Sequence, residues 1–253
     1  MRKKNNEVIE FLKEKEIQIV GFASIEENGQ RIPEEFSPQA LLNNVKTVIC
    51  FGVPIPMGVI YSESNDNLLY WRYCNMMYRS IDATENSLCL FLENKGYVST
   101  PIYSCYPWKI VKRDFWGLIP LVYWAEKAGI GRLTKSGLLG HPKYGTRILI
   151  GGVLTSMHLE PSPRIQAAIC PMDCVECIES CNVKAIDTNG KVDHNLCIRN
   201  ANTNPLMAHL LQDTELRKNI DFETIMNTIG VDDHSYYHCL ECLKMCPLNK
   251  KRI

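Results

Sequence analysis

The placement of the cysteines indicates what chemistry this sequence could do. Eight of the twelve cysteines lie in the last third of the 253-residue chain, between Cys170 and Cys246. Two segments there, 174–181 and 239–246, repeat the spacing C-x2-C-x3-C. A chain of this length buries enough apolar surface to fold without disulfide staples, and a cytosolic chain keeps its thiols reduced. We therefore expect these cysteines to bind metal rather than to form disulfides.

Eight thiolates in this arrangement are what two 4Fe–4S clusters require. In bacterial ferredoxins with two clusters, three closely spaced cysteines bind one cluster, and the next cysteine along binds the other. Applied here, the pattern assigns one cluster to Cys170, Cys174, Cys177 and Cys246, and the other to Cys181, Cys197, Cys239 and Cys242. The gap between Cys170 and Cys174 is one residue longer than usual. Structural zinc remains an alternative, although zinc sites favour paired C-x2-C units, and so do disulfides or free thiols.

The other four cysteines are scattered through the first two thirds of the chain. Cys50 lies in an apolar run, and Cys74 and Cys89 lie on helical apolar patterns, so we expect all three to be buried core thiols. Cys105 lies between aromatic residues and is a candidate for reactivity.

The first 160 residues carry the pattern of an α/β domain that would position the cysteine-rich segment. Apolar runs predict four strands, at 17–23, 45–51, 97–103 and 147–154. Three-to-four spacing predicts a short helix around residues 8–12 and a long helix over 67–94, which Gly96 ends. Strands that alternate with helices indicate a layered α/β sheet. The composition changes at 160–163, so we predict two domains, 1–160 and 161–253.

The order of these features resembles that of epoxyqueuosine reductases and, more distantly, of corrinoid-dependent reductive dehalogenases. The resemblance covers the cysteine block 170–247 and continues upstream. There, 128–136, 141–147 and 153–155 are similar to the family's A-G-L-G-W-x-G-K-x, P-x-Y-G-x-R and v-L-T segments. The resemblance implies a nitroreductase-like α/β domain that binds cobalamin and a C-terminal module, like a bacterial ferredoxin, whose two clusters supply electrons.

Seven residues in the upstream segments are the cofactor-binding candidates that the resemblance implies: Gly129, Gly131, Lys135, Ser136, Tyr144, Gly145 and Arg147. Glycine allows the backbone to approach a large planar cofactor closely. Lys135 and Arg147 could meet amides or the phosphate of a corrinoid tail. The alternative is that the glycines form tight turns and the two cations are solvated.

The sequence also departs from the family. Epoxyqueuosine reductases have a general-acid Asp in a V-D-S-A-P-like segment, whereas the corresponding residues 97–101 contain no acid. Tyr103 and Tyr106 follow directly, and a tyrosine can donate a proton during a reduction. Both are therefore catalytic candidates, with aromatic packing in a loop as the alternative.

Composition limits the partners that we expect. The 28 basic and 28 acidic residues cancel, whereas nucleic-acid binding calls for a basic surface, so tRNA is not expected to be a partner. No apolar segment follows the basic start, and no run of residues approaches the length of a membrane span, so we expect a cytoplasmic protein without a signal peptide or a membrane partner.

The sequence thus predicts a cobalamin-dependent iron–sulfur reductase of a small molecule, supplied with electrons by an external donor of the ferredoxin or flavodoxin type. One alternative is an electron-transfer protein that reduces or activates a corrinoid, held by itself or by a partner corrinoid protein. The other is an epoxyqueuosine reductase that acts on tRNA.

Overall fold

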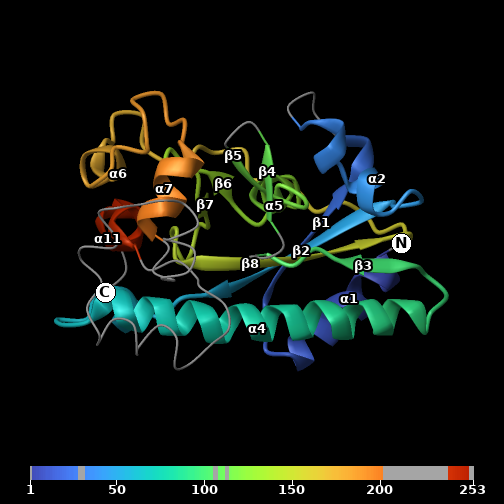
Figure 1. The fold of residues 1–253 in the computed structure, drawn as a ribbon. Coiled ribbons are helices and arrows are strands. Elements are labelled where there is room, and N and C mark those ends of the chain that lie inside the picture. Colours follow the sequence, from blue (N-terminus) through green and yellow to red (C-terminus); the bar gives the residue numbers. More distant parts are fainter. Residues whose placement is uncertain (1, 28–31, 105–107, 112–113, 202–238, 251–253) are drawn as a thin grey trace.

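A four-stranded antiparallel sheet lies at the centre of the protein, in the strand order β1–β2–β8–β3 (Figure 1). The computed structural model describes residues 2–27, 32–104, 108–111, 114–201 and 239–250. The sheet strands are β1 (Ile19–Ser24), β2 (Thr47–Pro54), β3 (Ser99–Pro101) and β8 (Ile148–Thr155). All four lie within the segments that the sequence predicts as strands, apart from one to three residues at some of their ends.

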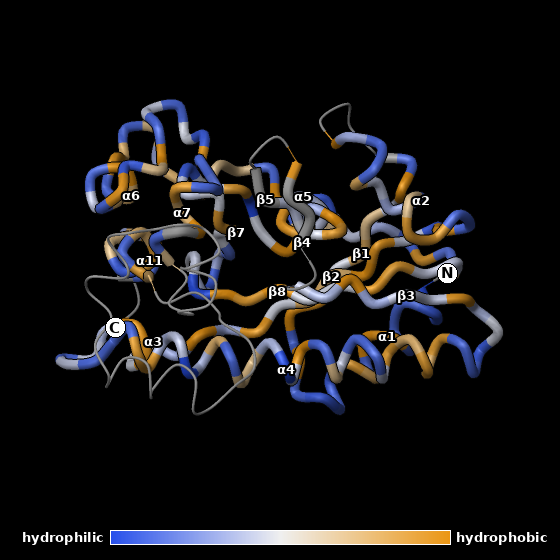
Figure 2. The backbone as a smooth tube through the Cα atoms, viewed as in Figure 1, coloured by the Kyte–Doolittle hydropathy of each residue, from blue (hydrophilic) through white to orange (hydrophobic). Residues whose placement is uncertain are grey.

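Both faces of the sheet are buried, because successive side chains of a strand point to opposite sides. Ile49 and Phe51 of β2 belong to one core cluster with α1 and α4, and Val48 and Cys50 belong to another with α5. Figure 2 shows mostly hydrophobic residues along β1 and β2. The longer helices are α1 (Arg2–Glu14), α4 (Asp66–Glu93), α5 (Leu121–Lys127) and α7 (His194–Ala201). The mixed α/β fold is thereby confirmed.

The 28-residue helix α4 runs under the sheet and is the longest element described (Figure 1). It ends where the sequence predicts. Gly96 has a φ of +85°, its N–H donates to the carbonyl of Glu93 at 2.8 Å, and the N–H of Tyr97 donates to the carbonyl of Leu92 at 3.1 Å. A left-handed glycine after a helix satisfies the last carbonyls in this way.

Shorter elements surround this frame. The short helices are η1 (Ile25–Glu27), η2 (Glu34–Phe36), α2 (Pro38–Leu41), α3 (Met57–Ile60), α6 (Glu176–Glu179), α11 (Glu241–Met245) and α12 (Pro247–Lys250). Two small antiparallel hairpins pair β4 (Trp108–Val111) with β5 (Asp114–Gly117) and β6 (Arg132–Leu133) with β7 (Leu139–Gly140).

The cysteine-rich end of the chain shares a hydrophobic core with the sheet and its helices. Leu240 and Leu243 are buried in the same core cluster as Val8 and Leu12 of α1. Helix α11 therefore contributes to the hydrophobic core of the first 160 residues. None of the described helices has the length and apolar character needed to cross a membrane.

Candidate metal centre

Four cysteines from two distant segments line one pocket. Cys170, Cys174 and Cys177 lie in and just before α6, and Cys246 lies between α11 and α12. The remaining lining residues of the pocket are Thr134, Ser136, Pro171, Pro247 and Leu248. This is the set of four that the spacing assigns to one cluster. Cys177 and Cys246 are about 70 residues apart in the sequence. The packing of α11 against α6 brings their segments together.

The four thiols that line this pocket, the first group, are close enough to affect one another's pKa. Burial raises the pKa of Cys177 to about 11, and the neighbouring Cys170, Cys174 and Cys246 raise it further because a second thiolate would be repelled. Thiols in such a group ionise together only beside positive charge. A bound metal ion supplies that charge and deprotonates a coordinating thiol outright.

The other four predicted ligands also lie close to one another. Burial raises the pKa of Cys197 to about 11, followed by the charges of Cys239 and Cys181. Burial also raises the pKa of Cys242, followed by the charges of Cys197 and Cys239, with Cys177 of the first group next. The two groups are therefore neighbours. Among the described residues, no set of three or more His, Cys, Asp or Glu side chains is arranged to hold a single metal ion.

Lys135 fixes the loop that carries the first cysteines. Its Nζ donates to the carbonyl oxygens of Met172 at 2.5 Å and Cys174 at 2.8 Å. Ser136 lines the cysteine pocket and shares a hydrogen bond of 2.9 Å with Thr134. The structure thus places both predicted cofactor-binding residues against the cysteine loop.

The three candidate glycines approach other parts of the chain closely. A Cβ on Gly129, whose φ is +74°, would lie 2.3 Å from the Pro163 carbonyl oxygen, and one on Gly131 would lie 2.5 Å from that of Gly140. A Cβ on Gly145 would lie 2.2 Å from Oδ1 of Asn249. The sequence predicts that the backbone at these glycines approaches a cofactor closely. In the structure, the atoms that lie close to the glycines belong to other residues of the protein.

Tyr144 and Arg147 follow in the same segment. The Tyr144 ring lies 5.2 Å from that of His141, tilted by 34°. Arg147 is buried, and its Nη1 donates to the carbonyl oxygen of Ile55. The Arg147 Nε has no hydrogen-bond partner in the described part of the chain. Burial lowers the pKa of this guanidinium.

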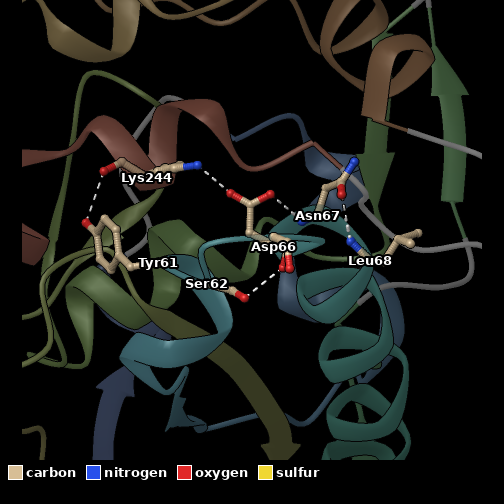
Figure 3. Close-up of polar contacts among 7 residues, drawn as sticks. Tyr61, Ser62, Asp66, Asn67, Leu68 and Lys244 are labelled. Carbon is tan, nitrogen blue, oxygen red and sulfur yellow. Dashed lines mark hydrogen bonds and ion pairs between the residues drawn. The ribbon is translucent and has the colours of Figure 1, made fainter.

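A polar contact joins the last cysteine motif to the start of α4 (Figure 3). The Lys244 Nζ of α11 donates to Oδ2 of Asp66, the first residue of α4. The hydroxyl of Tyr61 donates to the carbonyl oxygen of Lys244 at 3.0 Å. The segment 239–246 is therefore anchored through both its backbone and a side chain.

The catalytic candidates lie beyond β3. Tyr103 has a φ of +55°, and its N–H donates to Oε2 of Glu85 at 2.9 Å. Its hydroxyl donates to Oδ1 of Asn86 at 2.9 Å. Tyr106 and Cys105 lie outside the described residues. Sequence reasoning missed Glu85 and Asn249, because an isolated Glu or Asn inside a helical pattern carries no signal of its contacts.

The three core cysteines are confirmed. Cys50, Cys74 and Cys89 are buried, and burial raises the pKa of both Cys74 and Cys89 to about 12. The thiolate form that reacts or binds metal is therefore disfavoured at these positions.

The fold is that of a class of reductases with known structures. An epoxyqueuosine reductase from Streptococcus thermophilus aligns with 97% of this chain and 66% of its own, with a TM-score of 0.61 and 20% identity. A Bacillus subtilis structure, described as having its catalytic Asp loop swung out of the active site, gives 0.64 over 99% of this chain and 66% of that chain, at 19% identity. The reductive dehalogenase NpRdhA is more distant, with 0.53 at 14% identity over 92% of this chain and 30% of its own.

Sequence comparison also finds epoxyqueuosine reductases. The chain is similar to epoxyqueuosine reductases from Staphylococcus aureus, with 34% identity over 132 residues, and from Bacillus subtilis, with 29% over 126 residues. Each match covers 50% of this chain and 28% of the relative. The protein from Atelocyanobacterium thalassa is 31% identical over 163 residues, covering 64% of this chain and 45% of that one. The matches thus span less than half of these relatives. No family model matches the chain.

One expectation is wrong. The neutral net charge predicts that tRNA is not a partner, yet an epoxyqueuosine reductase in complex with an epoxyqueuosine-modified tRNA stem loop has the same fold, with a TM-score of 0.64 and 19% identity over 99% of this chain and 66% of that chain. Net charge is a sum over the whole molecule. Recognition of an RNA loop depends on the local placement of cations, stacking rings and hydrogen-bonding groups, which that sum does not report.

Proposed function

We propose that this protein is a reductase of the epoxyqueuosine reductase type, which acts on a nucleoside epoxide in tRNA with cobalamin and two 4Fe–4S clusters. One observation carries the proposal: the eight predicted thiols gather into two neighbouring groups of four, at one end of a sheet with an epoxyqueuosine reductase fold. The layout we infer is an α/β domain, 1–160, and a ferredoxin-like cluster module, 161–253.

The donor set of the cysteine groups fits iron–sulfur clusters. Four thiolates around each cluster are the usual ligation of a 4Fe–4S centre. The four thiols of the first group line one pocket. Lys135 holds the loop of Cys174 in place, and the Asp66–Lys244 pair holds the last motif. The ligand loops are therefore fixed by groups other than the metal.

Two buried polar atoms of α4 are of a kind that the amides of a cofactor could satisfy. Trp71 Nε1 and Asn75 Oδ1, one turn apart on α4, have no hydrogen-bond partner within the described segments. A buried donor or acceptor without a partner costs about 1–3 kcal/mol. The amide side chains of a corrin ring offer both donors and acceptors. When bound, cobalamin would supply a cobalt ion that clusters of low potential can reduce and that, in its low-valent form, can donate electrons to cleave a carbon–oxygen bond.

The overall reaction balances with two electrons and two protons. Both carbon–oxygen bonds of the epoxide are broken, a carbon–carbon double bond forms, and the oxygen leaves as water. The chain must therefore deliver two electrons from the cysteine end and at least one proton to the leaving oxygen. Residues 97–101 hold no carboxylic acid for that purpose, so Tyr103 is the described candidate.

The test is anaerobic reconstitution followed by iron analysis and turnover. We expect about eight irons per chain, and about four when Cys174 or Cys246 is replaced by Ser, with Cys50→Ala as a control. Cobalamin should then bind with a change in its absorbance. The reconstituted protein, reduced with dithionite, should convert an epoxyqueuosine-modified stem loop to the queuosine form.

The same experiment separates the alternative of an electron-transfer protein, which the missing acid at 97–101 favours. In that case cobalamin would be reduced while the modified stem loop stayed unchanged. Four or fewer irons in the unmodified protein would contradict the two-cluster assignment itself.

A further inference from the structure

We infer that the Thr146 hydroxyl and the Asn200 side-chain amide set the reduction potentials of the two proposed clusters, each through one hydrogen bond to one cysteine sulfur. This inference rests on the two-cluster part of the proposed function and is independent of cobalamin and of the substrate. Neither residue is a candidate on sequence grounds, because both lie outside the two cysteine motifs. Each of them contacts a different group of thiols.

Cys246 of the first group has two hydrogen-bond donors at its sulfur. One is the N–H of Leu248 in α12, and the other is the hydroxyl of Thr146, just before β8. Burial raises the pKa of Cys246, and both hydrogen bonds oppose that rise, as donors to a thiolate do. The thiolate, which is the form that binds metal, is therefore stabilised by a side chain from outside the cysteine-rich segment.

Close backbone packing brings Thr146 to this sulfur. A Cβ on Gly145, whose φ is +60°, would lie 2.7 Å from the carbonyl oxygen of Leu248 and 2.2 Å from Oδ1 of Asn249. Glycine permits both the positive φ and the short approach. Thr146 and Asn249 are each 2% exposed. Their polar groups are therefore bonded to the protein and not to solvent.

Asn249 fixes the direction of the Thr146 hydroxyl hydrogen. The Asn249 amide has one orientation, because Oδ1 accepts from the Thr146 N–H while Nδ2 donates to the Leu243 carbonyl. The same Nδ2 donates to the Thr146 hydroxyl oxygen at 3.0 Å. An amide NH2 group can only donate, so the hydroxyl hydrogen must point to another acceptor. The Cys246 sulfur is that acceptor, and hydrogen bonds in such a chain strengthen one another.

The second group has the same arrangement with a different side-chain donor. The Cys239 sulfur accepts from the N–H of Glu241, the first residue of α11, and from the side-chain amide of Asn200 on α7. Burial raises the pKa of Cys239, and these two hydrogen bonds lower it. Backbone donors, such as the Ala185 N–H that reaches Cys181 at 3.2 Å, remain after a substitution. The two side-chain donors can be removed one at a time.

A hydrogen bond to a ligand sulfur raises the reduction potential of its cluster. On reduction, a cluster takes up one electron from the external donor and gains one negative charge, while no covalent bond of the protein forms or breaks. A donor at the sulfur stabilises the more negative form more strongly, because hydrogen bonds strengthen with the charge on the acceptor. Removal of the donor should therefore favour the oxidised form and make the potential more negative.

The test is a redox titration of the reconstituted protein with dithionite, followed by EPR in the absence of cobalamin and stem loop. Thr146→Val keeps the shape of the side chain and removes the hydroxyl. It should shift the equilibrium of one cluster about tenfold toward the oxidised form, or by about 59 mV for a one-electron couple. Asn200→Leu should shift the other cluster in the same direction. Each substitution should thus move the half of the EPR signal that the other leaves in place.

Two control variants isolate the hydrogen bond. Thr146→Ser keeps the hydroxyl and should keep the original potential. Thr134→Val makes the same chemical change in the same pocket, but the Thr134 hydroxyl donates to the carbonyl of Leu138 at 2.8 Å, so both potentials should stay unchanged. Electron–nuclear double resonance gives a readout that a structural role would not move. An exchangeable proton coupled to the reduced cluster should be lost in Thr146→Val and present in Thr146→Ser.

Unchanged potentials in Thr146→Val and Asn200→Leu, at full iron content, would overturn the inference, and so would an equal shift in Thr134→Val. If Thr146→Val assembles only about four irons, the shift in Asn200→Leu decides. Turnover of the stem loop tests the proposed function separately. An unmodified protein that holds both clusters and turns over no stem loop would refute that function, whereas the expected shifts in the same preparation would leave this inference standing.

Discussion

The side-chain amide of Asn249 makes two hydrogen bonds to Thr146. They join the cysteine-rich end of the chain to the segment just before β8. Asn249 Oδ1 accepts from the Thr146 N–H at 2.8 Å, and Nδ2 donates to the Thr146 hydroxyl at 3.0 Å. The same Nδ2 donates to the carbonyl of Leu243 at 2.7 Å. The Thr146 hydroxyl in turn hydrogen-bonds to the thiol of Cys246 and lowers its pKa, against the larger effect of burial. The position of this predicted ligand therefore depends on one buried amide.

Replacing Asn249 by Ala should loosen this contact. The substitution leaves the Thr146 N–H without a partner in a buried place, at a cost of about 1–3 kcal/mol in the free energy of unfolding, and leaves the Leu243 carbonyl with the Cys246 N–H as donor. Urea unfolding measures that loss, and reconstituted Asn249→Ala should also release iron faster to a chelator. Asn44→Ala, at an exposed position, should change neither quantity. Normal stability together with normal iron retention in Asn249→Ala would show that the hydrogen bonds between Asn249 and Thr146 are dispensable.

Lys135 should be required for assembly of the first cluster rather than for the fold. Lys135→Met removes the charge that binds the carbonyls of Met172 and Cys174, so the loop should sample other positions. We expect iron after reconstitution to fall from about eight toward about four per chain, with little change in the melting temperature. The control is Lys191→Met, at an exposed position beyond α6. Full iron content in Lys135→Met would argue against a role in holding the loop.

The sequence predicts the sheet well because strands follow from regular apolar spacings, and the grouping of cysteines is likewise a prediction from regular spacing. Apolar runs mark the four strands, and C-x2-C-x3-C repeats separate the thiols into two sets that the structure brings together. The contacts of α11 with the core are not predictable in this way. Leu240 and Leu243 lie within a cysteine motif, and nothing in their local pattern shows that they belong to the core cluster that includes buried residues of α4.

Glycines and charged residues show the limit of sequence reasoning more clearly. Gly145 does mark a close approach, but its partner is Asn249, about a hundred residues further along the chain. Lys135 does bind oxygen atoms, but they are backbone carbonyls of the cysteine loop. A residue type indicates the kind of contact that a position makes. Which group makes that contact depends on long-range packing, and a single sequence does not contain it.

Glu85 should make stability depend on pH. Burial raises the pKa of its carboxyl from 4.5 to about 8, against the two backbone hydrogen bonds, which lower it. Between those values the folded chain holds a proton that the unfolded chain releases, so the free energy of unfolding should fall as the pH rises from about 5 to about 8. The slope due to one such group is at most about 1.4 kcal/mol per pH unit.

Comparing Glu85→Gln with the unmodified protein isolates this contribution. The difference in the free energy of unfolding between the two proteins, measured in urea at several pH values, should change steadily between about pH 5 and pH 8. It should level off above the folded-state pKa of about 8. Parallel stability curves over the whole range would mean that Glu85 keeps an ordinary pKa in the folded protein.

The Asp66–Lys244 ion pair should contribute modestly to stability and be sensitive to salt. The side chains are 22% and 37% exposed, and pairs of this kind contribute about 0.2–1 kcal/mol. A cycle of Asp66→Asn, Lys244→Met and the double variant should give a coupling energy in that range, smaller in 1 M salt because the Debye length then falls to about 3 Å.

The pair should also weaken in acid. The hydrogen bond from Lys244, with its charge, holds the pKa of Asp66 below its usual 3.8, so the stabilisation is present above about pH 4 and is lost as the pH falls through the folded-state value. Glu10→Gln, which breaks the exposed pair of Glu10 with Lys13 on α1, is the matched control and should leave iron retention unchanged. Because Lys244 lies in the last cysteine motif, Asp66→Asn should also speed the loss of iron to a chelator. A coupling energy indistinguishable from zero, with iron loss at the rate of Glu10→Gln, would show that the backbone contact from Tyr61 alone anchors the motif.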